Sequence, residues 1–147
     1  MRSPMTFNNI IIDANIVISL VNKQDSSRNK VVQKLKKLES EHVRFFLNPL
    51  IVSEICTVVL LRSKNVSLAK KAYQLLTAPG SNYIIEKLDE ELEQETYRIF
   101  TEQAKPKLSA TDCSLIAQAK LHGINNIFTL DQTLQKELGK YGLRLLT

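Results

Sequence analysis

Four acidic residues stand where a carboxylate could bind a metal ion, and two of them follow expected strands. Asp13 comes directly after the run Ile10-Ile11-Ile12, and Asp131 follows the apolar run 126–130. Three consecutive β-branched residues favour a strand that is covered on both faces, as in a parallel sheet between helices. Because ligands bind at the carboxyl edge of such sheets, where strand ends meet, we expect these two carboxylates to be neighbours.

The other two acids, Glu54 and Asp112, lie in segments with helical spacing. Glu54 is one turn beyond Ile51 and one turn before Val58, so it is expected on the apolar stripe of its helix. A buried carboxylate without a partner is costly, so its presence there calls for a reason. Asp112 lies three residues after Ser109, in the first turn of its helix, and is expected near the same sheet edge.

Four converging carboxylates repel one another strongly unless a divalent cation neutralises them. Ligation by oxygen alone, without His or Cys, indicates Mg²⁺ or Mn²⁺ rather than zinc. An ion bound in such a site lowers the pKa of a bound water molecule and offsets nearby negative charge. No histidine base or serine nucleophile is required.

Each acid also has a structural explanation. Asp13 and Asp131 could be N-caps of the short helices that follow them, and residues 109–112 fit a capping box. Glu54 suits such an explanation least, because its neighbours are apolar. The same alternative, a cap or a polar strand residue, applies to Asn15, Ser109 and Thr129. The metal site is favoured because all four acids are expected at one end of the sheet, which independent caps need not be.

The rest of the chain alternates between short apolar runs and amphipathic helical segments. Strands are expected at residues 10–12, 42–47, 82–86, 126–130 and 142–146. Helices are expected at 16–20, 27–38, 49–62, 68–76, 89–103, 109–122 and 131–138. In the acidic helix 89–103, the side chains expected to face inward include Leu92, Ile99 and Phe100. This alternation predicts an α/β fold with a parallel sheet between two helix layers.

The whole chain has a formal net charge of +5, and its basic residues are concentrated in the first half. Residues 1–75 contain 12 Lys and Arg against 5 Asp and Glu, and residues 76–147 contain 8 against 10. A basic surface attracts polyanions such as nucleic acid, although lysine-rich helix faces are often merely solvated. The residues that we single out for contact with an RNA backbone are Lys30, Lys34, Lys37, Arg62 and Lys64.

Length and composition predict an ordinary globular protein. The 147 residues are most simply one domain, and no apolar run approaches a membrane span. Residues 1–8 have one arginine and no apolar signal region, so we expect a cytoplasmic protein without a membrane partner. Cys56 and Cys113 lack metal-ligand spacing and are expected to be buried free thiols.

These motifs together resemble the PIN-domain nucleases, especially the small VapC-type ribonuclease toxins of toxin-antitoxin pairs. Segment 11–15 is similar to the opening motif of a strand, an acid and a small polar residue. Segment 52–55 resembles the helix glutamate motif, and 108–117 resembles the acid that follows a hydroxyl residue at a helix start. Segment 127–131 resembles the last motif, a hydroxyl residue and an acid after a strand. The similarity spans nearly the whole chain.

The resemblance implies a three-layer α/β/α sandwich with five parallel strands in the order 3-2-1-4-5. It implies an endoribonuclease that uses Mg²⁺ or Mn²⁺ and has Asp13, Glu54 and Asp112 as its main metal-binding acids, assisted by Asp131. The residues that would orient these acids are Asn15, Ser109 and Thr129. The resemblance further implies an antitoxin partner and a homodimer, whose surface we place on the helices between residues 50 and 76.

Other function classes remain open or lack their motifs. A PIN-like module that binds RNA or serves as a scaffold without cleaving it is the main alternative, and only an activity assay separates the two. A haloacid-dehalogenase-like site would have an aspartate where Asn15 stands, and a receiver domain would have an acidic pair before its first strand. The chain also lacks the glycine-rich loops that bind nucleotide phosphates.

Overall fold

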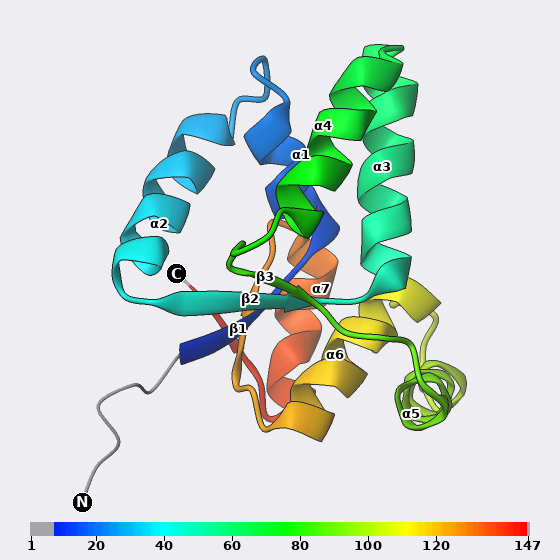
Figure 1. Ribbon diagram of the computed structural model, residues 1–147. Helices are drawn as coiled ribbons and strands as arrows, with labels where there is room; N and C mark the ends of the chain where they lie inside the picture. The colour runs from blue at the N-terminus through cyan, green and yellow to red at the C-terminus, as the bar shows by residue number, and fades with distance from the viewer. Residues whose placement is uncertain (1–7, 147) are drawn as a thin grey trace, which may run out of the picture.

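The central strand of the protein is β1 (Asn8–Ile12), in a computed structural model that describes residues 8–146 (Figure 1). Ile10 is 4% exposed, and Ile11 and Ile12 are fully buried. On one side β1 pairs with β2 (Val43–Leu47), and on the other with β4 (Asn126–Phe128). The prediction of a strand that is covered on both faces is therefore confirmed.

The five strands form one parallel sheet in the order β3-β2-β1-β4-β5, which confirms the predicted order. The edge strands are β3 (Tyr83–Ile85) and β5 (Arg144–Leu145). In the register of the two central strands, Ile12 is opposite Phe128, so β1 and β4 end at the same level. The residues that follow them, starting with Asp13 and Thr129, emerge side by side.

Helices cover the sheet on both sides, as the three-layer prediction requires. One group of helices that contact one another comprises α1 (Ala14–Val21), α2 (Arg28–Ser40), α3 (Pro49–Ser63) and α4 (Val66–Thr77). The other group comprises α5 (Glu90–Thr101), α6 (Ala110–His122) and α7 (Gln132–Glu137), which leads into a 3-10 turn at Leu138–Tyr141. Figure 1 shows the first group above β2, α5 and α6 mainly below it, and α7 passing behind it.

A buried polar network fixes α3 relative to α6. Asn48 caps α3 by accepting a hydrogen bond from the amide of Leu50 at 3.0 Å. Its Nδ2 donates to Ser114 Oγ at 3.1 Å and to Gln118 Oε1 at 3.3 Å. Gln118 in turn donates to the carbonyl of Leu47 at 2.9 Å. All three polar side chains are fully buried, so the network holds the start of α3 against α6 without contact with water.

Three side-chain predictions differ from the structure. Phe100 was expected inward on α5, but it is 38% exposed. Cys56 was expected to be buried and is only half-buried, whereas Cys113 is buried as predicted. Both thiols are free. Glu54 lies on the exposed side of α3 rather than on its buried stripe, because Ile51, Ile55 and Val59 alone form that stripe.

Two predictions concern the ends of the chain and membrane contact. The predicted absence of a secretory signal falls mainly on residues 1–7, which lie outside the described residues. Across residues 8–146, none of the helices combines the length and the apolar character needed to cross a bilayer.

The Asn48 network gives a stability prediction. We expect Asn48→Ala to lower the free energy of unfolding by about 2–4 kcal/mol, because it removes an N-cap and leaves two buried polar side chains with fewer partners. Asn65→Ala is the matched control, since Asn65 caps α4 through one bond to the amide of Leu68 but is exposed. The control should cost only about 1 kcal/mol. Equal losses in urea denaturation would contradict the assigned role of the network.

Candidate active site

Asp13 lies at the end of β1 and both of its carboxylate oxygens are hydrogen-bonded. Oδ1 accepts a bond from the amide of Ala14 at 2.7 Å, which makes Asp13 the N-cap of α1. Oδ2 accepts bonds from the Thr129 hydroxyl at 2.6 Å and from Asn15 Nδ2 at 3.3 Å. The side chain is 4% exposed. The strand ends thus bring together three residues that the sequence analysis grouped from distant positions.

Asn15 and Thr129 join the segment after β1 to the segment after β4. Asn15 Oδ1 accepts a bond from the amide of Leu130 at 3.0 Å, and Asn15 Nδ2 also lies 3.3 Å from Thr129 Oγ1. Thr129 Oγ1 accepts a bond from the amide of Asp131 at 3.0 Å. The Asp13 carboxylate is therefore held in one orientation by side chains that are themselves fixed.

Asp112 and Asp131 both serve as helix caps, as the structural alternative proposed. Asp112 Oδ2 accepts a bond from the amide of Ser109 at 3.0 Å, and Ser109 Oγ accepts one from the amide of Asp112 at 3.1 Å, which completes a capping box. Asp131 Oδ1 accepts bonds from the amides of Thr133 at 2.8 Å and Leu134 at 3.2 Å. Within residues 8–146, the second oxygen of each carboxylate has no hydrogen-bond donor, so capping leaves one oxygen of each available.

Glu54 lies in the second turn of α3 and is exposed, in contrast to the buried position expected for it. No hydrogen bond or ion pair is made by its carboxylate with any other part of the chain between residues 8 and 146. Its charged neighbours are the other three acids of the set. The exposed position removes the argument from a place on the buried stripe of α3, but the Glu54 carboxyl group is still partly desolvated and lies near the other carboxylates.

The electrostatics of the site are those of uncompensated negative charge. The pKa of Asp13 is raised to about 6, mainly by burial and to a smaller extent by the charges of Asp112 and Asp131, while the hydrogen bonds from Thr129 and Ala14 act in the opposite direction. The pKa of Glu54 is raised by partial desolvation of its carboxyl group and then by the charge of Asp13. The pKa of Asp112 is raised mainly by burial and also by Asp131. Every charged group that shifts these three pKa values is another carboxylate.

The four carboxylates have the right chemistry for a divalent cation that prefers oxygen ligands, but their side chains are not placed to bind one together. In the described part of the chain, no three His, Cys, Asp or Glu side chains are close enough to hold a metal ion as they stand. The four acids are near enough to repel one another, and carboxylate oxygens are the ligands that Mg²⁺ and Mn²⁺ prefer. Cation binding here would therefore need side-chain rotation, for which the exposed Glu54 is free to turn.

Sequence reasoning missed the contacts between helices that support this site from behind. Asn48, Ser114 and Gln118 tie together the helices that carry Glu54 and Asp112. Gln118 offered a signal, because it is a polar residue within an otherwise small and apolar helix segment. Gln135 of α7 was also missed; its Nε2 donates to the carbonyl of Thr129 at 3.1 Å.

The five basic residues predicted to contact RNA lie on two other parts of the fold. Lys30, Lys34 and Lys37 belong to α2, which Figure 1 places on the opposite side of the molecule from the start of α6. Arg62 and Lys64 lie at the end of α3, about 12 Å or more along the helix from Glu54. Their role in RNA contact stays a prediction.

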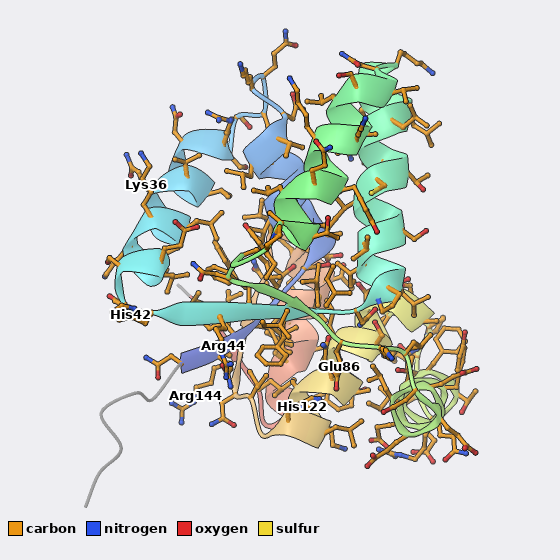
Figure 2. All side chains as sticks on the ribbon, in the orientation of Figure 1. Lys36, His42, Arg44, Glu86, His122 and Arg144 are labelled. Atoms are coloured by element: carbon orange, nitrogen blue, oxygen red, sulfur yellow. The ribbon has the colours of Figure 1, made fainter. Side chains whose placement is uncertain are left out.

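A separate charged cluster connects β2 and the residue after β3 to the end of α6 (Figure 2). The Arg44 guanidinium lies 5.9 Å from the centre of the Phe46 ring and donates to Asn9 Oδ1 at 3.2 Å. The ring of His122 packs against Phe46 with centres 5.8 Å apart, and its Nε2 contacts the Glu86 carboxylate. Arg44 lies near the amino end of β2, whereas Glu86 follows the last residue of β3, so the cluster extends along the sheet from its amino edge towards its carboxyl edge.

Comparison with known proteins identifies relatives over almost the whole chain. The sequence profile of the PIN domain family matches residues 10–140. A solved structure of VapC20 from Mycobacterium tuberculosis, described as a toxin that cleaves the sarcin-ricin loop, is similar with a TM-score of 0.73 and 17% identity, over 91% of this chain and 95% of that one. FitAcB from Neisseria gonorrhoeae is similar with a TM-score of 0.66 and 19% identity, over 94% and 96%.

A toxin-antitoxin complex from Klebsiella pneumoniae contains a further similar chain, with a TM-score of 0.62 and 19% identity over 94% of this chain and 96% of that one. No protein in a search of curated sequences matches significantly. The structural similarities therefore support the fold, and the family profile supports membership.

The raised pKa of Asp13 predicts a pH-dependent effect of Asp13→Asn. The folded protein binds a proton on the Asp13 carboxyl group more tightly than the unfolded chain does. The free energy of unfolding therefore falls as pH rises from 3.8 to about 6. An amide does not titrate, so the variant should lose less stability over this interval. The free energy of unfolding of the variant minus that of wild type should therefore be roughly 1–3 kcal/mol higher at pH 7.5 than at pH 4.

Urea denaturation at both pH values measures this difference, and the effect of the Thr129 bond on the titration is already contained in the pKa of about 6. Glu93→Gln is the control, since Glu93 is an exposed carboxylate on α5. A pH-independent difference between wild type and Asp13→Asn would show that Asp13 titrates as an ordinary carboxylate.

Proposed function

Because the chain belongs to the PIN domain family, we propose that it is a metal-dependent endoribonuclease that hydrolyses RNA phosphodiester bonds. The observation that carries this proposal is the gathering of four acids: burial and the charges of neighbouring acids raise the pKa values of Asp13, Glu54 and Asp112, and within residues 8–146 no Lys, Arg or His side chain contributes to these shifts. Structural ion pairs lower carboxylate pKa values, whereas a site for a divalent cation collects negative charge.

In this proposal Asp13, Glu54 and Asp112 hold Mg²⁺ or Mn²⁺, with Asp131 assisting. When bound, the ion would supply the positive charge that polarises the phosphodiester and makes water more acidic. Asn15 and Thr129 keep the Asp13 carboxylate in one rotamer through their hydrogen bonds. Ser109 does the same for Asp112, and the free oxygen of Asp112 stays available for the ion. Fixing the acids in advance reduces the reorganisation that catalysis requires.

The test of this proposal is cleavage of a labelled single-stranded RNA by the purified full chain. We expect cleavage with Mg²⁺ or Mn²⁺, loss of cleavage with EDTA, and recovery when the metal is added in excess. Cleavage that survives EDTA would contradict the mechanism. Binding without cleavage at any metal concentration would support the alternative, a PIN-like module that binds RNA or serves as a scaffold.

A role as the toxin of a toxin-antitoxin pair is the finer form of the proposal. It is supported by the similarity to the toxin VapC20 and to a chain of a toxin-antitoxin complex. The protein would then act in the cytoplasm as a single domain on cellular RNA and be inhibited by an antitoxin protein. A neighbouring reading frame that encodes a small DNA-binding protein would support this role over general RNA processing.

The proposed homodimer surface is supported by exposed apolar side chains on α3 and α4. The exposed fractions are 60% for Leu61, 72% for Val66 and 51% for Tyr73. Leu60 and Leu75, on the same two helices, are exposed by 38% and 36%. Exposed apolar side chains gathered on two helices that contact each other are typical of a protein interface. We therefore place the contact between two copies on this pair of helices.

Glu54→Gln is the sharpest single substitution for the catalytic proposal. Because Glu54 is exposed and makes no hydrogen bond within residues 8–146, the amide should leave the melting temperature almost unchanged. Cleavage should fall by at least about 100-fold, as when one electrostatic contact to a transition state is removed. Glu91→Gln, an exposed carboxylate on α5, is the control and should retain full activity. Normal cleavage by Glu54→Gln would remove Glu54 from the site.

The dimer proposal is tested by Leu61→Glu. We expect wild type to sediment at twice the chain mass of 16.7 kDa and the variant to shift towards the monomer, because the new charge would be desolvated in the interface. Leu121→Glu, at a side chain that is 37% exposed on α6, is the control and should remain dimeric. A variant at Leu61 with the same sedimentation as wild type would place the interface elsewhere.

A further inference from the structure

A hollow lies between the end of α5 and the start of α6, next to the proposed catalytic acids. It is lined by residues from Phe100 to Ser109 and has a volume of about 450 Å³. Small-molecule sites are commonly about 300–1,000 Å³, so it is large enough for one nucleotide. Ser109, on its wall, binds Asp112 through both its amide and its hydroxyl group. The hollow is therefore one residue away from a proposed metal-binding carboxylate.

One wall of the hollow is an exposed aromatic side chain. Phe100 is 38% exposed, although the spacing of apolar residues on α5 predicted it inward. Tyr97, one turn earlier, is 47% exposed and meets the Phe100 ring edge to face, with centres 6.3 Å apart and planes at 86°. The Tyr97 contact restrains the Phe100 ring and leaves part of its surface open to a ligand.

The opposite wall is held in place by one side chain. Gln103 Nε2 donates to the carbonyl of Leu108 at 2.9 Å and to the carbonyl of Phe100 at 3.1 Å, while Gln103 Oε1 accepts from the amide of Leu108 at 2.8 Å. These bonds link the end of α5 directly to the residue before Ser109. A rigid loop costs little entropy when a ligand binds, so the hollow is largely pre-formed.

The charges at the rim of the hollow favour an anionic ligand. Lys107 lines the hollow, and the exposed Lys105 lies in the same loop. Lys107 Nζ lies 3.7 Å from Glu137 Oε1, and Lys140 Nζ lies 3.0 Å from Glu137 Oε2. Because two lysines share one glutamate, these three side chains together carry a net positive charge. The acidic first turn of α5, at Glu90, Glu91 and Glu93, lies about 10 Å or more along the helix from Phe100.

We propose that this hollow is a base-stacking subsite, in which an unpaired base of single-stranded RNA stacks on Phe100 while Lys105 and Lys107 contact the flanking phosphates. Single-stranded nucleic acids are commonly bound by such a combination of aromatic rings and cations. A base held there would place its neighbouring phosphate towards Ser109 and Asp112. This inference rests on the proposed ribonuclease function. It adds that the RNA substrate must have an unpaired nucleotide beside the cleaved bond.

The experiment measures RNA binding in EDTA, so that its result does not depend on cleavage. The probe is a fluorescein-labelled RNA of 12 nucleotides without self-complementarity, followed by fluorescence anisotropy with the full chain. We expect Phe100→Ala and Phe100→Leu to raise the Kd roughly 5- to 100-fold, the range for stacking of one base, and Phe100→Trp to bind as well as wild type. Leu121→Ala, an exposed apolar residue on α6, is the control and should bind normally.

Two further probes separate stacking from a general loss of affinity. With the same RNA annealed to its complement, the Phe100 variants and wild type should bind equally. A series of RNAs with one abasic position should include one whose binding no longer depends on Phe100. Lys107→Ala should reduce the salt dependence of binding, because one phosphate contact is lost. Melting curves of each variant confirm that the fold is retained.

Single-stranded RNA binding that is the same for Phe100→Ala, Phe100→Leu and wild type would overturn the subsite. Equal weakening with the duplex would overturn it as well, since a duplex presents no unpaired base. If wild type binds RNA in a Phe100-dependent way but never cleaves it, the subsite stands and the nuclease proposal fails. If cleavage requires metal and Glu54 but not Phe100, the nuclease proposal stands and the subsite fails.

Discussion

The structure depends on holding negative charges together at the edge of a parallel sheet. β1 and β4 end at the same level, and the hydrogen bond from Thr129 to Asp13 closes the gap between the segments that follow them. Burial is the main factor that opposes ionisation of Asp13, and the charges of Asp112 and Asp131 also oppose it. The protein keeps this unfavourable arrangement by using each aspartate as a helix cap, so that backbone amides offset part of the cost. The helix starts at this sheet edge thus both provide the capping positions and bring the carboxylates close together.

Most of the fold could be predicted from the sequence because its signals are local. The run Ile10–Ile12 indicated a doubly covered strand. Local end signals also agree with the structure, since Asn48-Pro49 begins α3 and Gly123 ends α6. Strand order was not a local signal and came from resemblance to a family. The grouping of Asp13, Asn15 and Thr129 was predictable because residues after neighbouring parallel strands must meet.

The environment of individual side chains was less predictable, because spacing gives the face of a helix but not its neighbours. Glu54 shares a helical spacing with apolar residues, yet only one stripe of α3 is covered and Glu54 lies beside it. Phe100 follows the pattern of α5, but the loop after the helix does not extend over it. The network of Asn48, Ser114 and Gln118 joins residues up to 70 positions apart and has no local signal beyond a polar residue in an apolar helix. The exposed Phe100 and Glu54 are both residues to which we assign a function.

The central claim is that Asp13, Glu54 and Asp112 share one divalent cation. The most direct measurement is anomalous X-ray scattering from crystals of the full chain grown with MnCl₂. The predicted result is a manganese peak at coordination distance from carboxylate oxygens of at least two of these residues, with Glu54 turned towards Asp13. A fully occupied manganese peak elsewhere, or none at this sheet edge at saturating metal, would contradict the claim.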